Sequence, residues 1–270
     1  MLETRVASLL FLPVGTPAST YEKSKAHSNG EEARCLHEPI VSPSVTIVPQ
    51  RTFPLAAASA IADAIRVLGG QKISFAVSGG QTVVPIYQVL AKMDLPWGRT
   101  HLFQTDERAV EPTHQASNYR LIQETLVDNL PVPPVTFVRM EADLRDLDFA
   151  AQEYARQLPD RMDLVLLGIG EDGHICSIFP GQGGIWEAGD LAVPSQTPRG
   201  DMRLTLTPTY LERASTLVVV ACGSRKAKAV GGALAEAGLT RACPARLARA
   251  GNWILDEEAA RYVADPTSQN

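Results

Sequence analysis

The chain has 270 residues, of which 45% are hydrophobic and 20% charged, and its formal net charge is −5. This composition predicts a globular protein with a substantial core, and the acidic balance argues against a general nucleic-acid binder. No stretch approaches the roughly 18 apolar residues of a membrane span, so we expect neither a nucleic-acid nor a membrane partner.

The four cysteines are widely spaced and include no C-x-x-C pair, which indicates neither a zinc site nor a disulfide framework. We therefore expect reduced cysteines in a cytoplasmic protein. Residues 1–44 are rich in Ser, Glu, Pro, Lys and His without periodicity, and they predict a disordered or loosely packed extension. An early Glu3 and the lack of a cleavage site argue against a signal peptide. Residues 45–270 are expected to form one domain.

From Val45 onward, strand-like and helix-like segments alternate. The nearly all-apolar run at 163–167 is typical of a central parallel strand that is covered on both faces. Alternation of this kind predicts an α/β fold with a mostly parallel, doubly wound sheet. The expected strands are 45–48, 72–77, 100–105, 135–138, 163–167, 216–222 and an edge strand at 253–255; the expected helices are 53–68, one running through Tyr87 and Leu90, 117–129 with Ser117 as N-cap, 149–158, and one starting near Ser224.

Polar or glycine-rich segments follow four of these strands, at Ser78, Asp106, Gly168 and Gly223. In parallel sheets, ligands bind beyond the carboxyl ends of the strands. We therefore expect the four segments to converge on one side of the sheet.

The first segment, Ser78-Gly79-Gly80-Gln81-Thr82, joins a strand to a helix. Its glycines let backbone N–H groups approach an anion at the helix N-terminus. A tight turn without a ligand explains the pattern equally well, because both the P-loop and the dinucleotide-binding motifs are absent.

The second segment, Asp106-Glu107-Arg108, sets two acids and a base directly after a strand. Arg108 is suited to a bidentate phosphate contact, although a solvated charge cluster is the more common reason for such a run. Further along, Arg203 and Lys226 add cations. Lys226 falls in the first turn of a helix, where a cation opposes the helix dipole and an anionic partner would explain it.

The third segment, residues 168–181, is the most informative. It places Glu171, Asp172 and His174 after a glycine-ended strand, with His174 at the start of an expected short helical turn. A histidine titrates near neutral pH and can take a proton from water and return it. The competing interpretation is a histidine that caps a turn.

Together these segments resemble one family, the 6-phosphogluconolactonases of the glucosamine/galactosamine-6-phosphate isomerase superfamily. The similarity spans about residues 45–262. It rests on Ser78-Gly79-Gly80, Asp106-Glu107-Arg108, Ser117-Asn118-Tyr119, the run Gly168-x-Gly-x-Asp-Gly-His174-x-x-Ser-x-Phe-Pro-Gly181, Arg203-x-Thr-x-Thr207 and Gly223-x-x-Lys226. Related deaminases usually carry tyrosine where Arg108 stands and Asn-Glu-Pro after the histidine segment, which favours the lactonase.

The resemblance implies a modified Rossmann-like sheet like that of the deaminase and ribose-5-phosphate isomerase group. It implies lactone hydrolysis without metal or other cofactor, with His174 as general base and Asp172 or Glu171 orienting it. Backbone N–H groups of the loop 168–173 are candidates for stabilising the oxyanion. The positions expected to hold the substrate and its phosphate are Ser78, Gly79, Gly80, Asp106, Arg108, Arg203 and Lys226. A monomer suffices for this site.

Two departures stand in the first loop, where the family usually has Ser-Gly-Gly-Ser-Thr-Pro. Gln81 replaces the second serine and Val83 replaces the proline, so contacts with ring hydroxyls are expected to differ. Two alternative functions stay open. One is a sugar-phosphate isomerase or deaminase that uses Asp106 as base, and the other is a non-catalytic sugar-phosphate sensor.

Overall fold

A computed structural model describes residues 43–70 and 72–263. Its main sheet has seven strands, and every hydrogen-bonded pair of neighbours is parallel. The strand order is β1 (Ser44–Val48), β10 (Asn252–Asp256), β9 (Thr216–Ala221), β6 (Leu164–Gly168), β2 (Ile73–Val77), β3 (Thr100–Gln104) and β5 (Thr136–Val138). The mostly parallel α/β fold expected from the sequence is confirmed.

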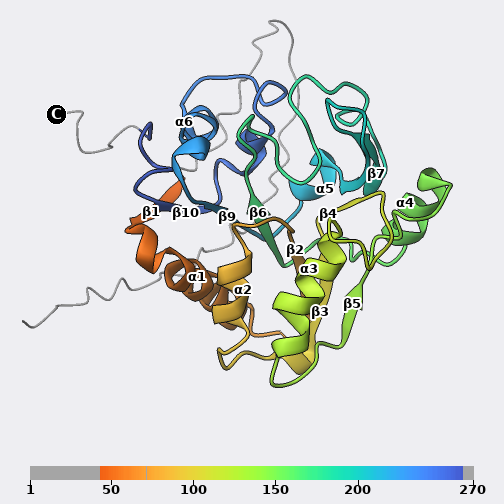
Figure 1. Cartoon of the computed structure of the whole chain (residues 1–270), viewed down its shortest axis with the longest axis horizontal. Helices are drawn as coiled ribbons and strands as arrows, with labels where there is room; N and C mark the ends of the chain where they lie inside the picture. Colours follow the sequence, from red (N-terminus) through yellow and green to blue (C-terminus); the bar gives the residue numbers. More distant parts are fainter. Residues whose placement is uncertain (1–42, 71, 264–270) are drawn as a thin grey trace, which may run out of the picture. The chain divides into compact units, whose positions relative to one another are not determined.

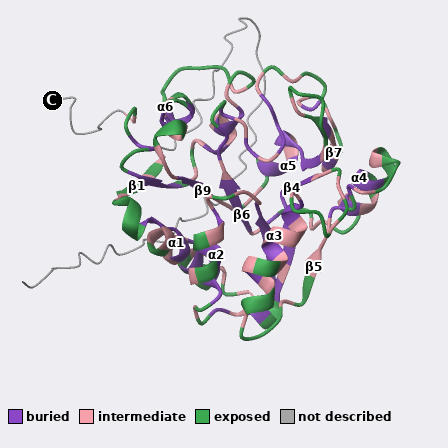
Figure 2. Cartoon of the chain, in the orientation of Figure 1, coloured by how far each residue is buried: buried purple, intermediate pink, exposed green. Residues whose placement is uncertain are grey.

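Helices cover both faces of this sheet (Figure 1). One face packs against α1 (Phe53–Leu68), α2 (Val84–Leu90) and α3 (Asn118–Thr125); the other packs against α4 (Leu147–Ala155), α5 (Pro208–Leu211) and α6 (Ala227–Leu234). Short 3₁₀ turns lie at Gln50–Thr52, Trp97–Arg99, Val127–Asn129, Ser224–Lys226 and Pro244–Ala248. The strands and the inward faces of the helices are the buried parts of the fold (Figure 2).

The central strand β6 shows why its sequence is apolar throughout. Successive side chains of a strand point to opposite faces, so Leu164 and Leu166 join the core under α1, while Val165 and Leu167 join the core under α4 and α6. All four are at most 1% exposed. A strand covered on both faces has no polar face, as the run at 163–167 predicted.

A second, three-stranded antiparallel sheet was not expected. It consists of β4 (Asp106–Arg108), β8 (Met202–Leu206) and β7 (Ala192–Gln196) in that order. The sequence places the acid–acid–base run directly after a strand, where the structure also has it, but it did not predict that the run itself forms a short strand. A three-residue strand is too short to show periodicity, and its pairing with β8 joins positions about 100 residues apart.

Three further expectations need correction. β10 is not an edge strand, because β1 pairs along its other side. Residues 174–178 form a turn with a bridge between Ile175 and Ile178 rather than a helical turn. The extension predicted for residues 1–44 lies outside the described residues except for Pro43 and Ser44, and Ser44 already begins β1.

The buried carboxylate of Glu107 joins the two sheets to α3. Glu107 is 2% exposed and accepts five hydrogen bonds. Its Oε1 accepts from the N–H groups of Arg108 (2.8 Å) and Asn118 (2.7 Å); its Oε2 accepts from Gln104 Nε2 (2.9 Å), Ser117 Oγ (3.1 Å) and the N–H of Tyr119 (2.7 Å). The negative charge also lies at the N-terminus of α3, where the helix dipole stabilises it.

We expect Glu107→Gln to lower the free energy of unfolding by at least about 3 kcal/mol. Glutamine turns one acceptor oxygen into a donor that faces two or more donors, and bonds to charged groups contribute about 1.5–3 kcal/mol each. Urea denaturation measures the change. Glu124→Gln in α3 is the control, because the exposed ion pair between Glu124 and Arg120 should contribute less than about 1 kcal/mol to stability. Equal stabilities of the two variants would contradict the proposed role of Glu107.

Candidate active site

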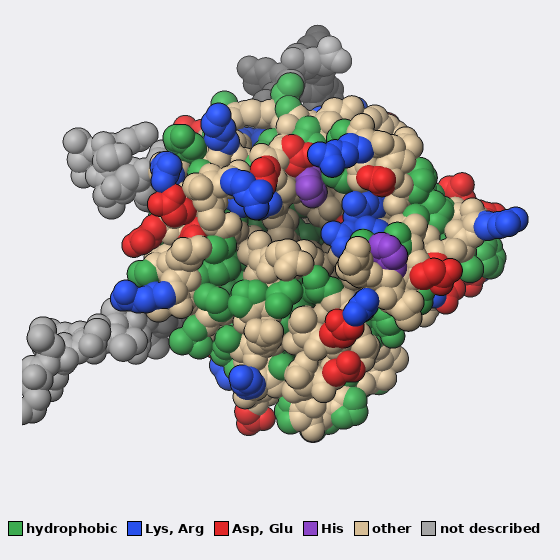
Figure 3. All heavy atoms as spheres, in the orientation of Figure 1, with side chains coloured by type: hydrophobic (Ala, Val, Ile, Leu, Met, Phe, Trp, Pro, Cys, Tyr) green, Lys and Arg blue, Asp and Glu red, His purple; other side chains and the backbone are tan. Residues whose placement is uncertain are grey.

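A cavity of about 500 Å³ opens beyond the carboxyl ends of the strands. The segments that follow β2, β3, β6 and β9 all contribute to its wall, so the expected convergence of the four strand-end segments is found. In the space-filling view it is a hollow bordered by Lys and Arg side chains and a histidine (Figure 3). All nine positions proposed from the sequence line it: Ser78, Gly79, Gly80, Asp106, Arg108, Asp172, His174, Arg203 and Lys226.

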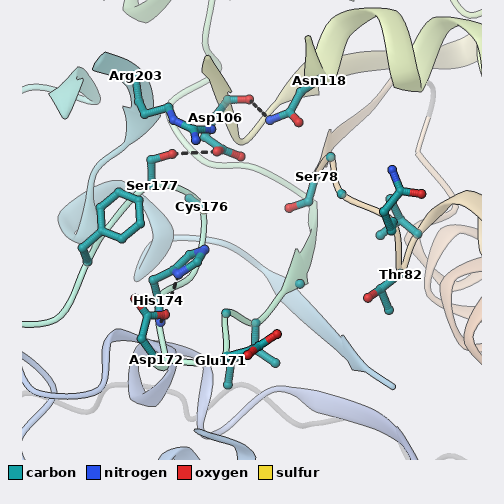
Figure 4. Close-up of a pocket in the computed structure, with 18 of the residues that line it drawn as sticks. Ser78, Thr82, Asp106, Asn118, Glu171, Asp172, His174, Cys176, Ser177 and Arg203 are labelled. Carbon is teal, nitrogen blue, oxygen red and sulfur yellow. Dashed lines mark hydrogen bonds and ion pairs between the residues drawn. The ribbon is translucent and has the colours of Figure 1, made fainter. Parts of the chain in front are cut away.

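His174 and Asp172 form a hydrogen-bonded pair on one wall of the cavity. His174 Nδ1 lies 2.6 Å from Asp172 Oδ1, and the same oxygen accepts the backbone N–H of His174 at 3.1 Å. The hydrogen bond from His174 lowers the pKa of Asp172, so that its carboxyl is ionised at neutral pH. An ionised carboxylate can only accept, which places the proton on Nδ1 and leaves Nε2 of the neutral ring as the basic nitrogen. Nε2 is on the side of the ring that faces the cavity (Figure 4).

The loop after β6 holds this pair through two glycines. A Cβ on Gly170 would lie 2.1 Å from His174 Nδ1 and 2.5 Å from Asp172 Oδ1, so only glycine leaves room for the pair. Gly173 has φ +90°, a region that side chains disfavour, and it turns the chain from Asp172 to His174. The Phe179 ring packs against the imidazole with centroids 4.8 Å apart.

Glu171, the other acid proposed to orient His174, also lines the cavity but does not contact the imidazole. Its carboxylate forms an ion pair with Arg225 at 3.2 Å. It also raises the pKa of Lys226, which burial lowers more strongly. Asp172 is therefore the residue that holds the histidine, and Glu171 belongs to the surroundings of the half-buried Lys226.

Arg108 and Arg203 stand side by side on the opposite wall, because they are paired in the register of β4 and β8. The Nε atoms of both are buried and have no hydrogen-bond partner within the described part of the chain. Arg108 donates through one terminal nitrogen to the carbonyl oxygen of Ala116. Burial and the neighbouring Arg108 charge lower the pKa of Arg203 from its ordinary value. Two adjacent guanidinium groups with unused donors indicate a site for an anion.

Asp106 lies beneath the arginine pair and is 8% exposed. Its Oδ2 accepts from Ser177 Oγ at 2.7 Å (Figure 4). Its Oδ1 accepts from Thr105 Oγ1 at 3.2 Å. The alternation of side chains along β4 turns Asp106 and Arg108 toward the cavity and Glu107 away from it. The carboxylate is thus held in a fixed orientation at the cavity floor.

The Ser78–Thr82 loop forms the remaining wall. The Ser78 hydroxyl is already engaged, since it donates to the carbonyl of Leu166 at 2.7 Å and lies 2.8 Å from Thr105 Oγ1. Ser78 therefore joins the ends of β2 and β3 to β6, and its own hydroxyl is not free to meet a ligand, whereas the Gln81 and Thr82 side chains line the cavity. A Cβ on Gly79 would lie 1.8 Å from Asn118 Oδ1, which explains the glycine there.

Several cavity residues were missed as site candidates. Asn118, which donates from Nδ2 to the Asp106 carbonyl oxygen at 2.9 Å, appeared in the sequence only as part of a motif. Cys176 takes φ +51° beside the cavity, and burial raises the pKa of its thiol. Thr197, on the β7–β8 turn, had no sequence signal because that hairpin was not foreseen.

Within residues 43–70 and 72–263, no three His, Cys, Asp or Glu side chains gather as a metal site would require. The cysteines described, Cys176, Cys222 and Cys243, are all free thiols. Among the same residues, every helix is too short or too polar to span a bilayer.

Comparison with known proteins agrees with this geometry. Residues 51–255 match the family described as glucosamine-6-phosphate isomerases/6-phosphogluconolactonase. A 6-phosphogluconolactonase from Synechocystis is 32% identical over 199 residues, covering 69% of this chain and 82% of the relative. The human 6-phosphogluconolactonase is 33% identical over 220 residues, covering 74% and 84%. The solved structure of the Trypanosoma brucei 6-phosphogluconolactonase superposes with a TM-score of 0.71 at 26% identity, over 83% of this chain and all of the other.

The match of the family covers most of the described residues, and the curated relatives are covered over more than four fifths of their length. The fold, the strand-end cavity and its histidine–aspartate pair lie inside the matched region. The chain therefore belongs to the glucosamine-6-phosphate isomerase/6-phosphogluconolactonase family, and within it to the 6-phosphogluconolactonase enzymes.

Proposed function

We propose that the chain hydrolyses 6-phospho-D-glucono-1,5-lactone to 6-phospho-D-gluconate, the lactone-opening step of the oxidative pentose phosphate pathway, in the cytoplasm. One observation carries the proposal. Within the described residues, a single cavity holds a histidine whose Nε2 has no hydrogen-bond partner on one wall and two guanidinium groups with unused donors on the other. A phosphorylated lactone has both features that such a cavity would meet: an electrophilic carbonyl and a dianionic group.

In the first step, Nε2 of His174 accepts a proton from a water molecule while the water oxygen bonds to C1 of the lactone. The lactone carbonyl becomes a tetrahedral oxyanion, and the His174 imidazole becomes an imidazolium. Asp172 stabilises this imidazolium through the 2.6 Å bond to Nδ1 and keeps the ring in the required tautomer.

In the second step, the bond between C1 and the ring oxygen breaks. The imidazolium returns its proton from Nε2 to the departing oxygen, and His174 is neutral again. The new carboxylic acid then loses a proton to solvent. Neither step needs a covalent bond between enzyme and substrate.

The backbone of the catalytic loop offers fewer oxyanion donors than the sequence suggested. The N–H of Gly170 already donates to the His174 carbonyl at 2.8 Å, and the N–H of Gly173 donates to the Gly170 carbonyl at 3.2 Å. The N–H of Asp172 donates to that residue's own carboxylate. Within the described structure the N–H of Glu171 has no acceptor on the protein, so we assign the oxyanion to this group.

Arg108, Arg203 and Lys226 are proposed to hold the phosphate, together with N–H groups of Gly79 and Gly80. The pKa of Arg203 and that of Lys226 are both lowered by burial, so a bound phosphate would compensate the desolvation of both cations. Fixing the phosphate sets the distance between the lactone carbonyl and His174, which contributes to the rate as positioning.

The deaminase alternative needs a carboxylate base that can approach a substrate carbon. Asp106 is the candidate, and both of its oxygens accept hydrogen bonds from Ser177 and Thr105 at the cavity floor. These bonds engage both carboxylate oxygens, and this favours the lactonase reaction over the deaminase reaction.

We expect His174→Ala to lower kcat about 10²- to 10⁴-fold with little change in KM, because general-base assistance contributes that much. The rate of lactone opening is measured by coupling to 6-phosphogluconate dehydrogenase, with the uncatalysed rate subtracted. A mutant whose KM alone changes would contradict the role of His174 as base.

Asp172→Asn should also lower kcat by at least about tenfold while leaving KM nearly constant. An asparagine at this position can donate to Nδ1, which favours the tautomer with the proton on Nε2 and removes the base. Glu171→Gln is the matched control, as its carboxylate contacts Arg225 and not the imidazole. If kcat falls equally in the two variants, the Asp172–His174 hydrogen bond is not the cause of the loss of activity.

Arg203→Ala should raise KM about 10- to 100-fold, as expected for a lost charge-assisted contact of about 1.5–3 kcal/mol. Arg199→Ala on the exposed tip of the same hairpin should leave KM unchanged. Steady-state kinetics over a range of lactone concentrations separate the two. An unchanged KM in the Arg203 variant would rule out its contact with the phosphate.

A further inference from the structure

Asp256 is a fully buried carboxylate that the proposed mechanism does not use. It ends β10 and is 0% exposed. Its Oδ1 accepts the N–H of Gly223 at 2.9 Å and the N–H of Ala259 at 2.8 Å, and its Oδ2 accepts from Cys222 Sγ at 3.1 Å. Burying a charge is unfavourable unless several donors compensate it. Three donors on one carboxylate therefore indicate a position whose geometry is tightly fixed.

Two of these donors belong to the connection between β9 and α6, which carries Lys226. Gly223 has φ +94°, a conformation that suits glycine, and it precedes the 3₁₀ turn Ser224–Lys226. The Gly223 carbonyl oxygen accepts the N–H of Lys226 at 3.0 Å. Asp256 is thus linked to the Lys226 backbone by two successive hydrogen bonds that hold opposite ends of residue 223.

The neighbouring thiol of Cys222 adds a second anchor to the same connection. Burial, followed by the contact with Asp256, raises the pKa of Cys222 to about 11, so the thiol keeps its proton at neutral pH and donates it to the carboxylate. Both residues between β9 and the 3₁₀ turn, Cys222 and Gly223, are therefore tied to β10.

The charges that act on Lys226 itself come from Glu171, Arg225 and Asp172. Asp256 reaches Lys226 through the backbone instead. In the fold, β10, β9 and α6 lie next to one another on the side of the sheet that is far from the arginine pair of β4 and β8 (Figure 1).

We propose that Asp256 is a positioning residue that sets where the Lys226 ammonium group meets the substrate phosphate. This inference rests on the proposed function, since it takes a phosphorylated ligand to be what Lys226 binds. Asp256 acts from the carboxyl end of β10 and does not itself line the cavity.

The test is a double-mutant cycle on KM. Asp256→Ala should raise KM for 6-phosphogluconolactone about tenfold with kcat changed less than about threefold, because small displacements of a positioning group weaken binding by such factors. In a Lys226→Ala background the same change should raise KM less than about twofold further. A KM that is unchanged, or that rises by the same factor in both backgrounds, overturns the proposal.

Two variants separate positioning from stability. Asp163→Ala is the matched control: its carboxylate accepts the N–H and hydroxyl of Ser74, both at 2.8 Å, before the start of β6 and so at the opposite end of the sheet. It should lower the melting temperature and leave KM unchanged. Asp256→Glu keeps the charge but moves the carboxylate by one methylene, so it should raise KM even if Asp256→Ala does not fold. An unchanged KM in a folded Asp256→Glu enzyme would also overturn the proposal.

The failure of the proposed function would look different. If the wild-type chain opens the lactone no faster than buffer and shows no binding of 6-phosphogluconate by calorimetry, the proposed substrate is wrong. That result would not bear on the contacts of Asp256 with the β9–α6 connection. An active wild type with the KM pattern described above supports both.

Discussion

The five hydrogen bonds on the buried Glu107 carboxylate are the constraint on which the cavity depends. They fix β4 against the start of α3 and against Gln104 at the end of β3. Because side chains alternate along a strand, pinning Glu107 on one side of β4 turns Asp106 and Arg108 to the other, into the cavity. The pairing of β4 with β8 then brings Arg203 beside Arg108. One structural carboxylate thereby determines where the two arginine side chains proposed to bind the anion lie.

Local charge, rather than net charge, decides what this cavity attracts. The chain as a whole carries a formal charge of −5. At the cavity, however, the two guanidinium groups repel each other, and their buried Nε atoms lack partners in the described structure. Such an arrangement is unfavourable without a ligand and becomes favourable when a dianion neutralises it. In the proposed function, the substrate phosphate supplies this neutralising charge, and the lactone carbonyl is assigned to the other wall, near His174.

The sequence predicted what local pattern determines. Helix α1 and strand β6 matched their expected bounds closely, because periodicity and a run of apolar residues define them. The rule that ligands bind beyond strand ends located the cavity, and the family resemblance selected residues that all line it. The features that the sequence did not predict depend on partners far away in the chain. These are the pairing of β4 with β8 and the pairing of β1 with β10. The role of Ser78 as a link between strands likewise depends on its contacts with Thr105 and Leu166. Asp256 carries no motif at all, and only its three donors reveal it.

Three carboxylates organise the cavity from the ends of three strands. Glu107 follows β3, Asp172 follows β6 and Asp256 ends β10, and each accepts at least one backbone N–H of the segment that carries a cavity side chain. A carboxylate suits this task because it only accepts, so several donors can converge on it. Since their charges are satisfied by these donors, they do not oppose a phosphate as free carboxylates would. This arrangement explains how an acidic protein could accept the proposed anion: these three acids hold the backbone in place, and the side chains of Arg108, Arg203 and Lys226 line the cavity.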